Sequence, residues 1–273
     1  MTNEKKLRFP TEPTTPTQPF TNQYKPPTDF AELPSKGKFY AENHPLRDKE
    51  NVELYFMTTK EEDILTSASL GKQGLVLDKL IESLLVNKNI KAKTLLPGDK
   101  SAILMNARKN AYDSDYRFVI LCEVCVAKQE IFINLEEIKP KENSYDNVEF
   151  TDSGNFLVTL PKTQATVELK LLTSEEEEEI IKTAEQKAKH NLPETAASDR
   201  LRQVVVSVGG NNDMLFISEF ISRMPIADSK FIKEVYMEVV PDVDLTFSHT
   251  CTECEYVNKG VVPMTGEFFW PNK

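Results

Sequence analysis

The sequence predicts an α+β protein made of two similar helix-plus-strand halves. Residues 52–62 align with residues 167–177, a spacing of 115, and both stretches read as a short strand that leads into a helix. Later landmarks repeat at a spacing of 129 residues: Asp99 with Asp228, Phe118 with Phe247, Cys122 with Cys251 and Cys125 with Cys254. The two spacings differ by about 14 residues, which indicates an insertion in the second half. So long a period indicates a duplicated domain rather than a solenoid of short repeats.

We therefore expect three segments: an extended arm over residues 1–32, a first half over 33–140 and a second half over 141–273. The first 30 residues hold six prolines and seven threonines, with little apolar surface to bury. Such a composition favours extended conformations and does not offset its own ordering entropy. The arm is then either a disordered tail or a segment that becomes ordered on a neighbouring subunit, with Phe20, Tyr24 and Phe30 as anchors.

The composition is that of a globular protein with an acidic surface. Of the 273 residues, 40% are hydrophobic and 28% are charged, and the formal net charge is −10. Because nucleic-acid affinity comes mainly from Lys and Arg, this balance argues against a nucleic-acid partner. No apolar run approaches the roughly 20 residues that span a bilayer, and Met1 to Lys6 lead into Pro and Thr rather than into the core of a signal peptide. We expect a protein that is made and kept in a cytoplasm.

The first half begins with a turn and a strand. Residues 33–40 read as a turn that feeds an extended segment, with Gly37 free to adopt positive φ. Residues 52–57 read as a strand, after which Thr58 or Thr59 caps a helix with an acidic first turn.

Two helices and a pair of strands follow. Apolar residues recur at helical spacing over 77–85, and Asp99 is expected to cap a further helix that carries Arg108. Residues 118–121 and 131–133 read as strands on either side of the first Cys pair. The order is strand, knuckle, strand.

The second half repeats this order. Residues 156–160 and 165–171 read as a hairpin, and Thr173 with Glu176 fits a capping box. The run Glu175–Glu179 is expected to be a solvated first turn; a cation site is the less favoured alternative, because consecutive helical residues point in different directions.

The rest of the second half contains one ambiguous segment. Residues 200–208 carry β-branched valines that favour a strand, whereas the first half predicts a helix there, and a helix is expected. Residues 214–224 read as an amphipathic helix, and Asp228 is expected to cap the next one. Residues 245–247 lead as a strand into the second Cys pair.

The four cysteines form two Cys-x-x-Cys pairs, each between strand-like segments. Zinc takes four thiolate or imidazole ligands in a tetrahedron, and two such turns supply four thiolates. In a reducing compartment, paired motifs of this kind bind metal more often than they form disulfides. We expect a structural zinc ion, bound at a zinc-ribbon-like β element that joins the two halves, with these ligands: Cys122, Cys125, Cys251 and Cys254. Four unmetallated thiols or a redox pair are the alternatives, and His249 is a less favoured substitute ligand.

Patterns that indicate an enzyme are missing from the sequence. A zinc deaminase needs Pro before the Cys-x-x-Cys, but Leu121 and Thr250 stand there. The three histidines form no His-Glu-x-x-His helix, and the nine glycines form no phosphate-binding loop. The sequence therefore predicts no catalytic residue, although catalytic carboxylates stay open because its 43 acidic residues are too many to rank.

Several short motifs carry a family resemblance through their order. They are Leu33-Pro34-Ser35-Lys36-Gly37 with Tyr40, the Thr59–Glu62 junction, Leu96-Pro97-Gly98-Asp99 followed by Arg108 and Tyr112, and Cys122-x-x-Cys125. Together they resemble the baseplate hub family of T-even-like contractile-tailed phages. The resemblance covers residues 33–125, and Cys251-x-x-Cys254 agrees more loosely. Asp113-Ser114-Asp115-Tyr116 stands where the family often has a glycine-containing turn.

This resemblance implies a structural part of the tail baseplate, located in the virion and assembled in the host cytoplasm. It implies no enzyme activity and no small-molecule substrate. The partners would be other hub, wedge or tail proteins, with the arm docked on a neighbouring subunit. Two alternatives stay open: a baseplate assembly chaperone that leaves the particle, and a zinc-dependent binding or regulatory protein.

Overall fold

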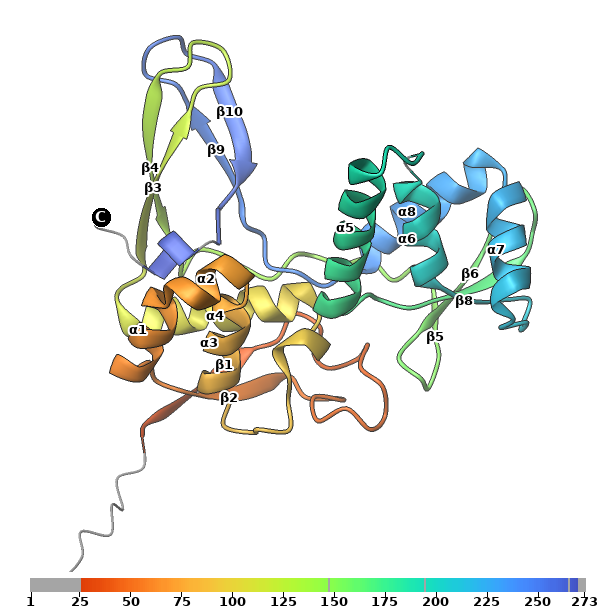
Figure 1. Cartoon of the computed structure of the whole chain (residues 1–273), viewed down its shortest axis with the longest axis horizontal. Helices are drawn as coiled ribbons and strands as arrows, with labels where there is room; N and C mark the ends of the chain where they lie inside the picture. The colour runs from red at the N-terminus through yellow and green to blue at the C-terminus, as the bar shows by residue number, and fades with distance from the viewer. Residues whose placement is uncertain (1–25, 147, 194, 265, 270–273) are drawn as a thin grey trace, which may run out of the picture.

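The computed structural model describes residues 26–146, 148–193, 195–264 and 266–269, and it confirms the α+β class. Helices combine with small antiparallel sheets in two lobes, and a pair of β-hairpins projects from the first lobe (Figure 1). Within the described residues, no helix is both long enough and apolar enough to cross a membrane. The expected anchors Phe20 and Tyr24 lie outside the described residues.

The first lobe packs helices against a two-stranded sheet. Its elements are β1 (Thr28–Glu32), β2 (Asn51–Tyr55), α1 (Thr59–Thr66), α2 (Ala68–Gln73), α3 (Val76–Leu84), the 3-10 turn η1 (Ala92–Thr94) and α4 (Pro97–Ala111). The strand β1 was not expected from the sequence. It pairs antiparallel with β2 along its whole length, and Phe30 remains 62% exposed on it.

The second lobe has a four-stranded antiparallel sheet in the order β5-β6-β7-β8. Its elements are β5 (Glu149–Phe150), β6 (Phe156–Thr159), β7 (Thr166–Leu169), α5 (Ser174–Lys189), α6 (Ala196–Val204), β8 (Val205–Val208), α7 (Met214–Arg223) and α8 (Ile226–Val239). The helix expected over 200–208 is therefore wrong for its second part. Val205 begins a strand because its backbone pairs with Leu169 at the sheet edge, where β-branched residues pack well.

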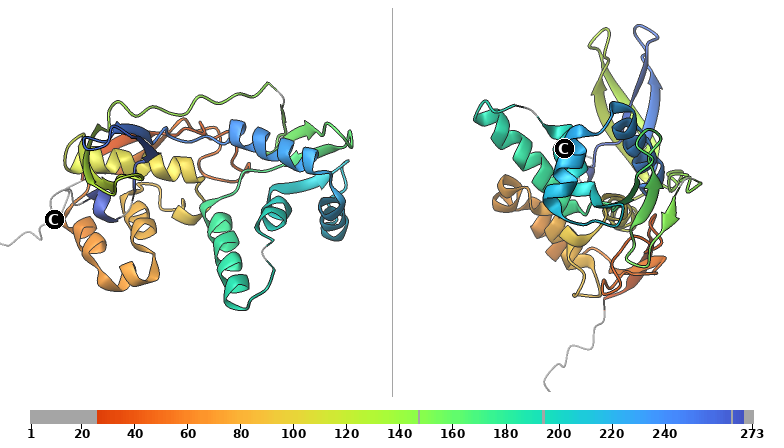
Figure 2. Two further views of the ribbon diagram at one scale, coloured as in Figure 1. Left: turned by 90° about the horizontal axis from the view of Figure 1, so that it is seen from above. Right: turned by 90° about the vertical axis from the view of Figure 1, so that its right-hand side faces the viewer.

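The projecting hairpins come from different halves of the chain. One is β3 (Asp115–Leu121) with β4 (Lys128–Asn134), and the other is β9 (Thr246–Thr250) with β10 (Val257–Val261). They stand side by side, as Figure 2 also shows, and we call them together the ribbon. Between the two hairpins, the centroids of the Phe118 and Phe247 rings are 5.2 Å apart. The chain then returns to the first lobe in the 3-10 turn η2 (Gly266–Phe269).

Equivalent contacts in the two lobes agree with the predicted duplication. Thr58 and Glu61 form a capping box at α1, and Thr173 and Glu176 form one at α5. In the first lobe, Leu54 on the strand before the capping box pairs with Leu85, which follows α3. In the second lobe, Leu169 on the corresponding strand pairs with Val205, which follows α6.

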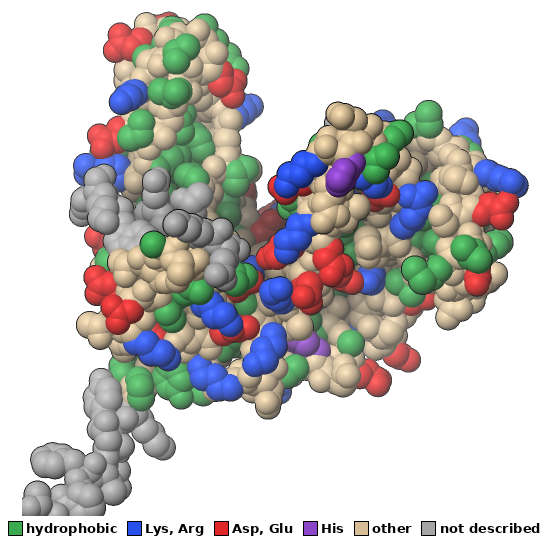
Figure 3. Space-filling model, viewed as in Figure 1, with side chains coloured by type: hydrophobic (Ala, Val, Ile, Leu, Met, Phe, Trp, Pro, Cys, Tyr) green, Lys and Arg blue, Asp and Glu red, His purple; other side chains and the backbone are tan. Residues whose placement is uncertain are grey.

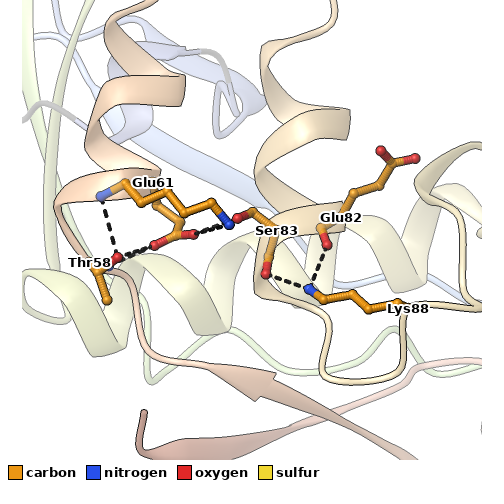
Figure 4. A network of polar contacts seen from close by, with 6 residues as sticks. Thr58, Glu61, Glu82, Ser83 and Lys88 are labelled. Atoms are coloured by element: carbon orange, nitrogen blue, oxygen red, sulfur yellow. Dashed lines mark hydrogen bonds and ion pairs between the residues drawn. The ribbon is translucent and has the colours of Figure 1, made fainter. Parts of the chain in front are cut away.

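The capping box of α1 is also tied to α3 (Figure 4). The Ser83 hydroxyl donates to Oε1 of Glu61 at 2.5 Å, and Lys88 Nζ donates to the carbonyl oxygens of Glu82 and Ser83 at 3.1 and 2.9 Å. A cation near the last carbonyls stabilises a helix C-terminus. The network thus fixes the start of α1 against the end of α3.

The expected caps Asp99 and Asp228 have a different role. The helices α4 and α8 begin two residues before them, at Pro97 and Ile226, and neither has a side-chain cap. Both carboxylates are fully buried and accept hydrogen bonds from a distant turn instead. An acidic residue in the first turn of a helix can either cap that helix or bind another segment. The sequence does not separate these two roles, and the capping prediction is wrong.

The turns that these carboxylates bind are themselves equivalent. The N–H of Ser35, in Leu33-Pro34-Ser35, donates to Asp99 at 3.0 Å, and the N–H of Lys162, in Leu160-Pro161-Lys162, donates to Asp228 at 2.7 Å. The first turn contains Gly37 at φ 71°, as expected. In each lobe, therefore, a buried carboxylate at the start of the last long helix binds a Leu-Pro turn.

The run Glu175–Glu179 is only partly solvated. Glu176 closes the capping box and pairs with Lys170, while Glu177 binds Arg200 on α6 through two hydrogen bonds of 2.6 and 2.8 Å. Bidentate pairs of this kind have defined geometry and hold two elements in register. The acidic turn thus fastens α5 to α6.

Two antiparallel segments connect the lobes. Pro140 and Val243 form an isolated bridge, and the N–H of Lys141 donates to the Asp242 carbonyl at 2.8 Å. At the start of α5, the N–H of Ser174 donates to the Leu95 carbonyl of the first lobe at 2.8 Å. These contacts join both halves of the chain near the base of the ribbon.

Candidate metal centre

Each hairpin of the ribbon ends in a Cys-x-x-Cys turn of the same shape. The N–H of Cys122 donates to the carbonyl of Ala127 at 2.9 Å, and the N–H of Cys251 donates to that of Tyr256 at 2.8 Å. Val126 and Glu255 follow the second cysteine of each pair and adopt left-handed φ values of 59° and 61°. Residues with a Cβ seldom adopt this conformation, so its presence at the same position in both turns indicates a shared requirement.

The two turns bring all four sulfur atoms together. They lie within 4.8 Å of one another, and the Cys122–Cys254 and Cys125–Cys251 sulfur pairs are each 3.6 Å apart. A disulfide bond needs a separation of about 2.05 Å. Zn–S bonds of about 2.3 Å in a tetrahedron place the sulfurs about 3.8 Å apart. The cluster therefore has the donor set and approximate size that a structural zinc ion requires.

Two buried amides link the hairpins in a reciprocal way. Oδ1 of Asn258, on β10, accepts from the N–H of Glu123 in the first turn at 3.0 Å. Oε1 of Gln129, on β4, accepts from the N–H of Thr252 in the second turn at 3.0 Å. Both amides are almost fully buried. Asn258 also directs its Nδ2 at the Cys122 sulfur, 3.7 Å away, so it orients a possible ligand as well as the turn.

The electrostatics of the cluster favour one thiolate but not several. The backbone N–H groups of Cys125 and Val124 stabilise a Cys122 thiolate and lower its pKa to about 6. The N–H of Tyr256 lowers the pKa of Cys254, but burial and the three neighbouring sulfurs outweigh it and raise that pKa to about 12. A divalent cation among the sulfurs would reverse this preference, because metal coordination favours the thiolate form.

The structure brings together all four cysteines predicted as ligands. His249 does not join them; its Nε2 lies 3.2 Å from Oε1 of Gln129, which fits an ordinary strand-end side chain. Sequence reasoning missed Gln129 and Asn258. They too are 129 residues apart, so the spacing that pairs the cysteines could have identified them.

Among the residues that the structure describes, the four cysteines are the one group of His, Cys, Asp or Glu side chains whose spacing suits a metal ion. The cluster lies at the tip of the ribbon. Cys122 and Cys251 are buried, while Cys125 is exposed. The cluster thus lies where it can stabilise the ribbon.

Comparison with known proteins gives one match. The profile of a family described as T4 bacteriophage base plate protein matches residues 26–270, which is most of the chain. No curated protein and no solved structure matches significantly. The chain therefore belongs to the T4 bacteriophage base plate protein family.

Proposed function

We propose that this protein is a structural component of the baseplate hub and that a zinc ion on Cys122, Cys125, Cys251 and Cys254 closes its ribbon. Membership of a baseplate family supports a structural role in the virion tail, with other phage baseplate proteins as partners. The same membership suggests a protein without enzyme activity. Assembly would take place in the host cytoplasm, and the N-terminal arm would dock on a neighbouring subunit.

The observation that carries the zinc proposal is the convergence of two thiol pairs that are more than a hundred residues apart in sequence. Without a metal, each hairpin is a two-stranded element, which is marginally stable in water. When bound, the zinc ion supplies four metal–sulfur bonds and no reactive chemistry. Gln129 and Asn258 hold the two turns in the relative position that such bonds need.

Exposed apolar side chains support a role in protein contacts. Hydrophobic side chains reach the surface of the ribbon (Figure 3), and Val119, Leu121 and Phe132 are each more than half exposed there. Apolar and aromatic side chains of this kind can form the buried centre of an interface with a neighbouring subunit. A projecting ribbon with such a surface suits a subunit that several neighbours contact.

Two measurements test this proposal. Mass spectrometry of purified particles should find the protein in the virion, and its absence from particles would favour an assembly chaperone. Elemental analysis of the purified chain should find one zinc per molecule, whereas metal-free protein with the wild-type melting temperature would contradict the zinc proposal.

A matched pair of variants tests the zinc ligands. Cys125→Ser removes a ligand, while Val124→Ser makes a similar change at the adjacent exposed residue. Structural zinc sites in peptides have apparent binding free energies of about 10–16 kcal/mol, so loss of one of four ligands should weaken metal binding and loosen the ribbon. Limited proteolysis should then cleave the ribbon in the Cys125 variant and in chelator-treated protein, but not in the Val124 variant.

A further inference from the structure

The last long helices of the two lobes, α4 and α8, are equivalent but are covered differently. On α4, Leu104 and Arg108 are 4% and 0% exposed. Nε of Arg108 donates to the carbonyl oxygen of Phe268 at 2.9 Å. Phe268 and Phe269 are buried in the core, and the Phe268 ring lies 4.8 Å from that of Tyr116. The turn η2 thus contacts this end of α4 through its backbone, and its two aromatic side chains are buried in the same hydrophobic core.

The same positions on α8 are open. Lys233 and Met237 lie 129 residues after Leu104 and Arg108, and both are exposed, Met237 by 62%. They line a cavity of about 240 Å³ between α6 and α8, whose other lining residues are Ala197, Arg200, Leu201, Val204, Ile232 and Tyr236. Most of this lining is apolar. In the part of the chain that the structure describes, no aromatic turn comparable to η2 covers it.

We propose that this cavity is a docking site for an aromatic side chain carried by a segment of a neighbouring baseplate protein. The proposal rests on the proposed structural role in the baseplate. The duplicated lobe supplies the main argument, since the turn η2, which carries Phe268 and Phe269, contacts the equivalent end of α4. Aromatic residues that enter apolar pockets are typical anchors of protein interfaces.

The size of the cavity agrees with a side chain rather than a small molecule. Its 240 Å³ lie below the roughly 300–1,000 Å³ of typical small-molecule sites. Arg200 is held by its two hydrogen bonds to Glu177 and lies 5.4 Å from the Tyr236 ring, so this wall of the cavity is fixed in place.

A second copy of this chain is a poorer occupant. Its aromatic turn is already committed, because Phe268 and Phe269 are 1% and 0% exposed in their own first lobe. Supplying them to another copy would uncover Arg108 and its buried hydrogen bonds. An exchange of this kind would therefore lose as much apolar contact as it gains.

The cavity can be tested with a peptide of residues 264–269, which carries the two phenylalanines. The dye-labelled peptide is titrated against the full chain, and fluorescence anisotropy is expected to show saturable binding. Met237→Lys should weaken this binding roughly tenfold, since it places a charge on an apolar wall. Met214→Lys is the matched control, because Met214 is 82% exposed on the same lobe but does not line the cavity.

Two results would overturn the proposal: no saturation at millimolar peptide, or equal affinity for the Met237→Lys variant. The second result would mean that the peptide binds elsewhere, for example in place of η2. Ala197→Phe provides an independent check, because an aromatic ring placed at the cavity mouth should block the peptide without adding a charge.

An experiment on particles separates this proposal from the proposed function. A photo-crosslinking amino acid at Met237 should join the protein to an aromatic-bearing segment of another baseplate protein in purified particles, and the same substitution at Met214 should not. If the wild-type chain is absent from particles, the proposed function fails whatever the peptide does. If it is present but the peptide does not bind, only the docking site fails.

Discussion

Removal of the buried Asp99 carboxylate should weaken the first lobe more than the equivalent change weakens the second. Asp99 accepts three hydrogen bonds: from the N–H of Ser35 at 3.0 Å, from the Ser35 hydroxyl at 2.6 Å and from the Tyr40 hydroxyl at 2.8 Å. Asp228 accepts two, from the N–H groups of Lys162 and Thr163 at 2.7 and 3.0 Å. The two sites thus differ in the number of donors that each substitution would leave without an acceptor.

The size of the effect follows from these contacts. A buried donor that loses its partner costs about 1–3 kcal/mol, so the three donors that Asp99→Ala leaves without an acceptor cost about 3–9 kcal/mol. Burial raises the pKa of Asp99, which means that its charge is itself costly in the folded state, and removing that charge offsets part of the loss. We expect a net loss of about 2–4 kcal/mol for Asp99→Ala. For Asp228→Ala we expect about 1–3 kcal/mol, because its two donors belong to the exposed residues Lys162 and Thr163 and can bind water instead.

Urea unfolding at neutral pH measures both variants. The chain has two lobes, so two probes are needed: a fluorophore on the exposed Lys60 of the first lobe and one on Lys230 of the second. Asp99→Ala should move the first-lobe transition to lower urea, and Asp228→Ala should move the second-lobe transition by less. Equal shifts at both probes, or no shift for Asp99→Ala, would refute the argument that these carboxylates hold the Leu-Pro turns.

Three further predictions concern single contacts. Gly98→Ala should destabilise the first lobe by about 1–3 kcal/mol despite the higher helix propensity of Ala, because its Cβ would lie 2.2 Å from the Pro241 carbonyl oxygen; a raised melting temperature would contradict this. Arg108→Met, which installs the residue found at the equivalent position of α8, should release η2 and cost about 2 kcal/mol, so protease should cleave near Phe268 earlier than in wild-type protein. Burial raises the pKa of Asp228, but the N–H groups of Lys162 and Thr163 outweigh burial, so the folded-state pKa is lowered. The Asp228 carboxylate therefore stabilises the fold above the unfolded-state pKa near 3.8, and this stabilisation is lost as the pH falls from there through the folded-state pKa. An Asp228→Asn variant should lose less stability in acid than the wild-type protein does.

Local signals explain most of what the sequence could predict about the fold. The capping boxes at Thr58 and Thr173 and the hairpins around the cysteines depend on neighbouring residues, and the structure confirms them. The strand β1 depends instead on pairing with β2, whose residues are about 25 positions away. Val205 to Val208 likewise become a strand only because an open sheet edge is available to them. Such tertiary partners override local propensity, so one sequence does not reveal them.

The sequence predicted the cysteines that the structure brings together, but not the residues that support the two turns. Paired cysteines between two strand-like segments are recognisable from the sequence alone, which is why it pointed to four residues: Cys122, Cys125, Cys251 and Cys254. Gln129 and Asn258 are ordinary strand residues until the two hairpins are seen to face each other. Only that contact explains why a buried amide is present at each position.

The reciprocity of the ribbon has a consequence for how the two halves depend on each other. One half supplies only two thiolates, so neither hairpin can complete a four-ligand site alone. Gln129 binds the second turn and Asn258 binds the first, which is the pattern of an interface between two equivalent surfaces. Zinc binding would therefore require both halves to be folded at their bases, and loss of either Cys pair should be equally damaging. The lobes, by contrast, differ in how these helices are covered: η2 contacts the end of α4, whereas the corresponding residues of α8 line an open cavity, where we propose that a partner docks.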